Sequence, residues 1–158
     1  MSRVSQSLAR RVWQTAIIIL LLPVLLPLIV LALTFWLLHR MTLYLLVWIL
    51  WLPKGKDILF VYSDSPIWKE YMTQQVLPLV EERAVILNWS EKSTWRRWTL
   101  AVSVLRAFGG EREFNPMVIL FRPLRRARVF RFWSAFRGWK HGKTEQLEHL
   151  RNELFLHL

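Results

Sequence analysis

Two groups of side chains in this sequence could bind a ligand or do chemistry. The first surrounds two prolines and combines carboxylate, hydroxyl, indole and amide groups: Asp64, Ser65, Pro66, Trp68, Asn115 and Pro116. Asp64 follows a run of strand formers and precedes a helix start, where open α/β folds often bind ligands. Asp and Ser also cap helices at such positions, so a capping role for Asp64 and Ser65 stays open. No Gly-rich phosphate loop follows the strand, so no motif supports nucleotide binding.

The second group is a run of basic side chains with aromatic residues between them. Its members, called the basic group below, are Arg122, Arg125, Arg126, Arg128, Arg131, Arg137, Lys140 and Lys143. The group could be a solvated face of the domain, a patch that lies on anionic lipid, or a nucleic-acid surface. A membrane segment in the same chain would bring this group close to lipid head groups. We therefore rank nucleic acid below the other two interpretations.

Metal and cofactor chemistry find little support. The chain has no cysteine, which excludes disulfides, thiol redox chemistry and Cys-ligated metal. None of the four histidines is spaced four residues from another, the spacing that puts two metal ligands on one helical face. No pair of carboxylates or nucleophile–base pair can be recognised for acid–base catalysis. We predict that the chain holds no cofactor and no metal.

The N-terminal third is apolar enough to enter a membrane. From Trp13 to Leu52 the only charged side chain is Arg40. The run is too long for a signal-peptide core of ~7–15 residues, and no small-residue cleavage site follows it, so we expect it to be retained. One arrangement is a helical hairpin that turns around Pro23 and Pro27. The other is a single crossing by residues 13–38, followed by an interfacial helix at 41–52.

Charge favours the hairpin. Basic residues precede the apolar run and Lys54 and Lys56 follow it, and basic flanks stay in the cytoplasm. His39 and Arg40 fit this arrangement poorly, whereas in the single crossing they lie at the far interface. We expect a basic tail at 1–12, a membrane anchor at 13–52 and a soluble domain at 53–158. The expected location is a bacterial inner membrane, with the soluble domain in the cytoplasm.

The remainder predicts an α/β domain with the element order β-α-β-α-β-β-α. Strands are expected at 57–62, 83–89, 117–121 and 128–133. Helices are expected at 65–82, from Ser93 or Thr94 to 108, and from Thr144 onward, with a kink at Pro78. The first three strands alternate with helices and should form a parallel unit. The last two are joined by a short turn and should be antiparallel.

This order, with a proline at the first helix and another before the third strand, resembles the thioredoxin-like fold over residues 57–158. Asp64-Ser65-Pro66-Ile67 stands where that family carries Cys-x-Pro-Cys, and Asn115-Pro116 where it carries a cis-proline. Neither redox cysteine is present, so the resemblance implies a redox-inert relative with a cis bond before Pro116. A flavodoxin-like fragment is the alternative fold.

The expected function is that of an interaction or scaffold module at the membrane surface, rather than an enzyme. Its expected partners are anionic membrane lipids and a protein, with the site at Asp64 and Asn115. The alternatives are an enzyme that acts on a lipid-linked or small anionic substrate in the same groove, and a membrane-tethered nucleic-acid-binding protein. Net charge favours polyanions in general: 22 basic residues stand against 11 acidic ones.

Overall fold

The computed structural model describes residues 3–158 apart from 97, 111–114, 140–141 and 143, and leaves out the side chains of residues 3–12, 15–17 and 19–20. The chain divides into two compact units, Met1–Met41 and Thr42–Leu158. Two members of the basic group, Lys140 and Lys143, are among the residues that the structure does not describe.

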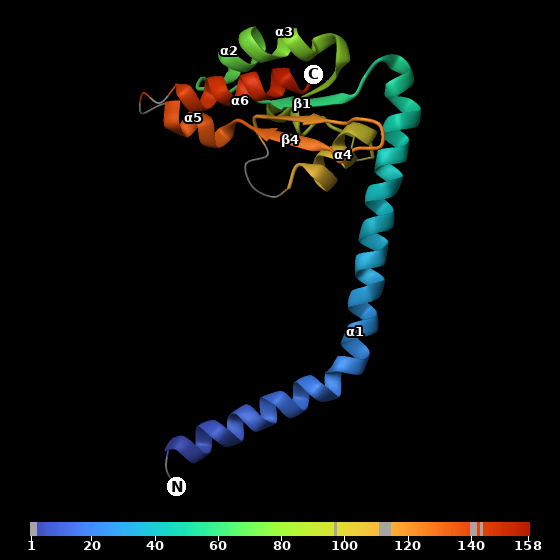
Figure 1. The fold of residues 1–158 in the computed structure, drawn as a ribbon, viewed down its shortest axis with the longest axis vertical. Coiled ribbons are helices and arrows are strands. Elements are labelled where there is room, and N and C mark those ends of the chain that lie inside the picture. Colours follow the sequence, from blue (N-terminus) through green and yellow to red (C-terminus); the bar gives the residue numbers. More distant parts are fainter. Residues whose placement is uncertain (1–2, 97, 111–114, 140–141, 143) are drawn as a thin grey trace. The chain divides into compact units, whose positions relative to one another are not determined.

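The apolar segment forms one helix, α1, from Arg3 to Leu50, with Pro23 and Pro27 inside it. The predicted hairpin is therefore not what the structure has. A proline removes one hydrogen bond and displaces the preceding turn, which bends a helix but need not reverse it. Figure 1 shows α1 bending within its blue N-terminal part and continuing as a helix.

The second unit is built on a four-stranded sheet in the order β2-β1-β3-β4. Its strands are β1 (Ile58–Tyr62), β2 (Ala84–Asn88), β3 (Met117–Leu120) and β4 (Arg128–Arg131). β1 and β2 are parallel, with Ile58 opposite Ala84. β3 is antiparallel to β1, with Val61 opposite Met117. β4 is antiparallel to β3, and this second pairing is the one that the sequence predicted.

The predicted parallel unit of three strands is wrong for β3. Its first residue, Met117, pairs with Val61 near the end of β1, so β3 starts at the end of the sheet where β1 and β2 finish. A strand that starts there must run back in the opposite direction. The alternation of strands and helices alone does not show at which end of the sheet the strand after a connecting helix begins.

Both faces of the sheet are covered by helices. One face packs against a layer formed by α2 (Lys69–Tyr71), a π-helical turn (Met72–Val76), α3 (Leu77–Val80), α5 (Trp133–Trp139) and α6 (Glu145–Leu156). The other face packs against α4 (Leu100–Phe108) and the last turns of α1. Figure 1 shows α2, α3 and α6 on one side of the sheet and α4 on the other.

The end of α1 belongs to the core of the second unit. Leu43, Val47 and Trp51 are buried in one apolar cluster with Ile119 of β3 and with Phe121, the residue that follows β3. The predicted boundary between anchor and soluble domain lies at residue 53, whereas the compact unit begins at Thr42. Hydrophobic periodicity could not distinguish helix residues that enter the membrane from those that pack in the domain core, because residues 42–50 are apolar on nearly every side of the helix.

Three other elements differ from expectation. The helix predicted from Ser93 or Thr94 begins only at Leu100, where the Thr99 side chain caps it by accepting from the Val102 N–H. Trp98 therefore precedes the helix and is 92% exposed. The predicted 65–82 helix begins at Lys69 and passes through the π-helical turn before Pro78, which lacks the N–H that a regular α-helix would use. α5 occupies a stretch predicted as strand end and loop.

Candidate functional site

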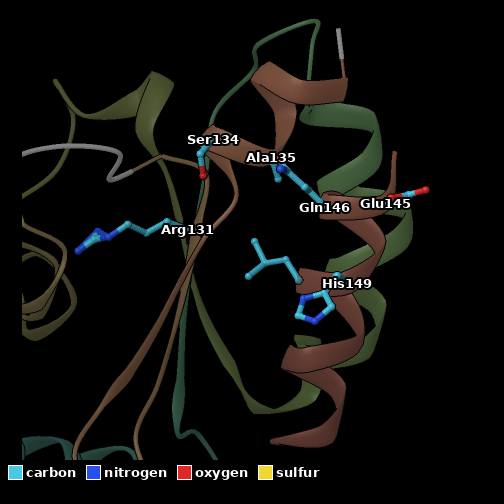
Figure 2. Close-up of a pocket in the computed structure, with 7 residues that line it drawn as sticks. Arg131, Ser134, Ala135, Glu145, Gln146 and His149 are labelled. Atoms are coloured by element: carbon cyan, nitrogen blue, oxygen red, sulfur yellow. The ribbon is translucent and has the colours of Figure 1, made fainter. Parts of the chain in front are cut away.

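An open cleft of about 650 Å³ lies between β4, α5 and α6 and is lined by Arg131, Ser134, Ala135, Glu145, Gln146, His149 and Leu150. Its charged side chains do not converge on a common point. Figure 2 shows Arg131 and Glu145 extending in opposite directions. Arg131 donates instead to the backbone oxygen of Gly109 at 2.8 Å. This cleft therefore lacks the convergent polar groups of a specific binding site.

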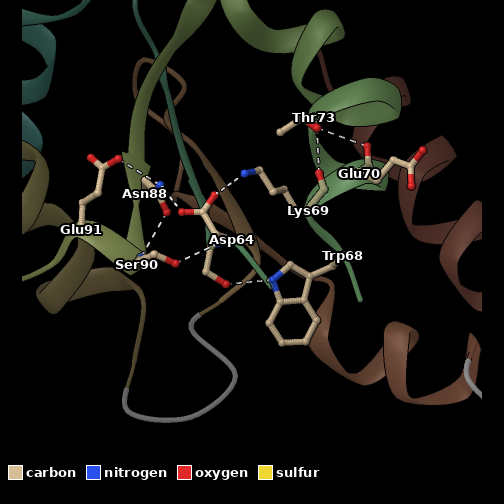
Figure 3. A network of polar contacts seen from close by, with 9 residues as sticks. Asp64, Trp68, Lys69, Glu70, Thr73, Asn88, Ser90 and Glu91 are labelled. Atoms are coloured by element: carbon tan, nitrogen blue, oxygen red, sulfur yellow. Dashed lines mark hydrogen bonds and ion pairs between the residues drawn. The ribbon is translucent and has the colours of Figure 1, made fainter. Parts of the chain in front are cut away.

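A convergent polar cluster lies at the carboxyl ends of β1 and β2, shown in Figure 3. Asp64 is at its centre. One carboxylate oxygen, Oδ1, lies 2.7 Å from Lys69 Nζ, and the other, Oδ2, accepts from Asn88 Nδ2 at 3.0 Å. The backbone N–H of Asp64 donates to Ser90 Oγ at 2.9 Å, and Asn88 Nδ2 also reaches Glu91 Oε1 at 3.2 Å. The cluster joins the loops that follow the two parallel strands.

These contacts keep Asp64 ionised. The hydrogen bond from Lys69, followed by the one from Asn88, lowers the pKa of Asp64 below its ordinary value of 3.8. The same contact with Asp64 raises the pKa of Lys69 above 10.5. A carboxylate with a lowered pKa is a poor general acid or base near neutral pH. It is suited to hold a hydrogen-bond donor or a cationic side chain of a ligand.

The turn after β1 is fixed by an indole. Trp68 Nε1 donates to the hydroxyl of the buried Ser63 at 3.0 Å. Ser65 Oγ accepts from the Ile67 N–H at 3.4 Å, which is a weak local turn contact rather than a bond to a ligand. Pro66 is exposed on the same turn.

Asn115 and Pro116 lie at the same end of the sheet. The antiparallel register that pairs Val61 with Met117 places Pro116 and Asn115 beside the residues that follow β1. The Asn115–Pro116 bond is cis, as predicted. The Oδ1 atom of Asn115 is buried, and none of the described residues donates a hydrogen bond to it. Such an acceptor usually has a partner, because an unpaired buried polar atom costs roughly 1–3 kcal/mol.

Sequence reasoning named Asp64 but missed the residues that hold it. Lys69, Asn88, Ser90 and Glu91 follow no recognised motif, and the two loops meet only because β1 and β2 are parallel neighbours. Asn88-Trp89-Ser90 fits a glycosylation sequon, a match that we regard as chance and that gives no indication of the cluster. Among the described residues, no group of three or more metal-ligating side chains is present.

Three arginines of the basic group are held in intramolecular contacts. Arg122 donates to the backbone oxygen of His157, and Arg128 contacts the ring Nε2 of the same residue. Arg131 is bonded to Gly109. Both contacts bring His157, the residue after α6, against the start of the β3–β4 turn and the first residue of β4. These three guanidinium groups therefore have structural roles.

The other described members are more exposed. Arg137 lies over the Trp133 ring at 4.9 Å from its centroid, on α5. Arg125 and Arg126 are exposed at the tip of the β3–β4 turn, residues 122–127. The described members of the basic group thus extend from that turn to α5. Although they are close in sequence, they do not form one uniform patch on the surface.

Most of the exposed large apolar side chains among the described residues lie on α1. Every described large apolar side chain from Leu21 to Leu38 is substantially exposed. One helix near the N-terminus is long and apolar enough, by length and composition, to cross a membrane. Thr34 satisfies its hydroxyl within the helix by donating to the Val30 oxygen at 2.8 Å.

Comparison of the chain with family models, with curated proteins and with solved structures found no match.

Proposed function

We propose that this chain is a membrane-anchored, redox-inert interaction module with a thioredoxin-like domain. In this proposal α1 crosses the membrane once, and the second unit binds an extended segment of a partner protein at the cluster around Asp64. A single crossing separates the basic N-terminal tail from the domain, and we place the domain on the cytoplasmic side because it carries more of the excess basic charge, which anionic lipids attract. The convergence of Lys69, Asn88 and Ser90 on Asp64 is the observation that carries the binding role.

The length of α1 supports a single crossing. Residues 21–38 would extend about 27 Å as an α-helix, close to the ~30 Å thickness of the hydrocarbon core. His39 and Arg40 follow directly, at the depth where polar side chains reach head groups. Arg40 lies over the Trp36 ring at 4.9 Å from its centroid, and tryptophan is common at that depth.

The thioredoxin-like fold is supported by the order of the elements. Its β-α-β-α-β-β-α order is retained with α5 added, and Pro116 directly precedes β3 as the resemblance implies. The Asp64 turn and Asn115 then lie at one end of the sheet. Asn115 Oδ1 could accept from a backbone N–H of an extended peptide, and Asp64 could accept from a second donor.

A photo-crosslinker at Glu91, on the exposed edge of the cluster, tests this function in membranes that contain the full chain. We expect a discrete protein adduct, and Asp64→Ala should reduce it because the central acceptor is lost. The matched control carries the crosslinker at Gln75, which is exposed on the π-helical turn. Equal adducts from both positions, or adducts that Asp64→Ala leaves unchanged, would refute a partner site at this cluster.

A further inference from the structure

The tip of the β3–β4 turn presents a bulky apolar side chain between cations. Leu124 is 91% exposed and has a φ of 58°, a left-handed conformation that non-glycine residues rarely adopt. Arg125 and Arg126 follow it and are exposed too. The turn is closed by the Arg125 N–H, which donates to the Arg122 oxygen at 3.2 Å. Neither burial nor conformational preference explains a leucine at this position.

The turn is attached directly to the end of α1. The hydroxyl of Tyr44 accepts from the backbone N–H of Ala127, the last residue of the turn. The Tyr44 ring packs edge-on against Phe108 and Phe121, with centroids 4.9 and 5.7 Å apart. Tyr44 thus fixes the turn to the first residues of the second unit.

Chain length then limits how far the turn can lie from the proposed membrane crossing. Only four residue steps separate Arg40 from Tyr44, and even an extended chain covers no more than about 14 Å in that number. This limit holds whatever direction α1 takes. The side of α1 turned away from the sheet is apolar as well, since Leu45 and Ile49 are exposed there.

We propose that the β3–β4 turn is a second membrane contact, which holds the domain against an anionic lipid surface. Leu124 enters the boundary between head groups and acyl chains, and Arg125 and Arg126 bind lipid phosphates. This inference rests on the proposed membrane crossing of α1. It assigns the contact to the turn rather than to the whole basic group, whose other described arginines are bonded within the domain or lie on α5.

The contact would orient the partner site. The turn lies at the amino end of β1, where the Phe121 N–H donates to the Asp57 oxygen, and the Asp64 cluster lies at the carboxyl end. A strand rises about 3.3 Å per residue, so the two sites are separated by roughly 20 Å. Two attachments to the membrane, α1 and the turn, would restrict rotation of the domain and leave the Asp64 end open to a partner.

The absence of native cysteine permits a direct test in the full chain. Leu124→Cys, labelled with an environment-sensitive fluorophore, is reconstituted in vesicles of phosphatidylcholine with 30% phosphatidylglycerol that carry a shallow spin-labelled lipid quencher. We expect a blue-shifted emission that the lipid quenches. Gln75→Cys, exposed on the helical layer of the other sheet face, serves as the control and should be quenched little.

Charge reversal tests the role of the arginines. Arg125→Glu with Arg126→Glu should lower the ratio of inserted to free Leu124 label by at least about tenfold, because two attractions become repulsions. The control, Lys92→Glu with Arg137→Glu, changes charge equally at two other exposed positions and should have little effect. High salt should weaken insertion as well.

Three outcomes would overturn the proposal. The first is a label at position 124 that is not quenched, in chains that resist alkaline extraction from the vesicles. Such resistance would show that the membrane anchor is intact, so this result would count against the turn contact alone. The second is equal insertion for the two charge-reversed variants. The third is a label that responds to an added oligonucleotide but not to lipid, which would identify a nucleic-acid surface. Extraction of the chain by alkali would refute the anchor itself, and with it the function proposed above.

Discussion

The substitution Val47→Ala tests whether the end of α1 belongs to the core of the domain. Val47 is fully buried, with 0% of its side chain exposed, among Leu59, Ile119 and Phe121. Removing two methyl groups costs about 1.6 kcal/mol of transfer free energy, and the cavity left behind adds about 1 kcal/mol. Alanine is the better helix former by about 0.5 kcal/mol. The free energy of unfolding of the domain should fall by about 2 kcal/mol.

The full chain in nanodiscs is heated while near-ultraviolet circular dichroism follows the aromatic core. For a unit of this size, 2 kcal/mol corresponds to a drop in Tm of roughly 6–12 °C. The matched variant is Ile49→Ala, two residues along the same helix, where the side chain is 65% exposed. It should change the free energy of unfolding by less than about 0.5 kcal/mol. Equal effects of the two variants would refute the placement of α1 in the core.

Three further predictions concern single residues. Lys69→Met should raise the pKa of Asp64 toward 3.8, measured by carboxyl NMR, and an unchanged pKa would contradict the contact. In the parent, the stabilisation from Asp64 is complete above its ordinary pKa of 3.8 and is lost as the pH falls through its lower pKa in the folded protein. Arg83→Met should lower the free energy of unfolding by about 2 kcal/mol, because it leaves the largely buried Asp57 carboxylate without its ion pair, and a loss below 0.5 kcal/mol in urea titrations would contradict this. Leu124→Asn should raise the free energy of unfolding by about 0.5–1 kcal/mol, since asparagine adopts a positive φ more readily; a stability loss would show that the leucine supports the fold.

Much of the secondary structure could be predicted because local signals were strong. All four strands were expected within two residues of their observed ends, from β-forming runs bounded by turn residues. The final helix followed from the spacing of Leu147, Leu150 and Leu154. The start of α4 was misplaced because Trp95 and Trp98 keep helical spacing, although Trp95 in fact packs edge-on against Trp89 outside the helix.

The end of α1 could not be assigned to the domain core from sequence, because an apolar helical segment has the same residue pattern whether lipid or a sheet covers it. Leu43 and Val47 share their buried cluster with Ile119 and Phe121, which lie more than 70 residues further along the chain. The Asp64 cluster was only partly predictable for a related reason. Asp64 has a recognisable position after a strand, whereas Asn88 and Ser90 reach it through the parallel pairing of β1 with β2.

The membrane topology of the two chain ends tests the central claim most directly. A tag at each terminus is exposed in turn to protease on each side of sealed membrane vesicles. If α1 crosses the membrane as one continuous helix, the two tags must be cleaved from opposite sides, and the proposed orientation puts the C-terminal tag in the cytoplasm. Cleavage of both tags from the same side would contradict a single crossing and restore the hairpin.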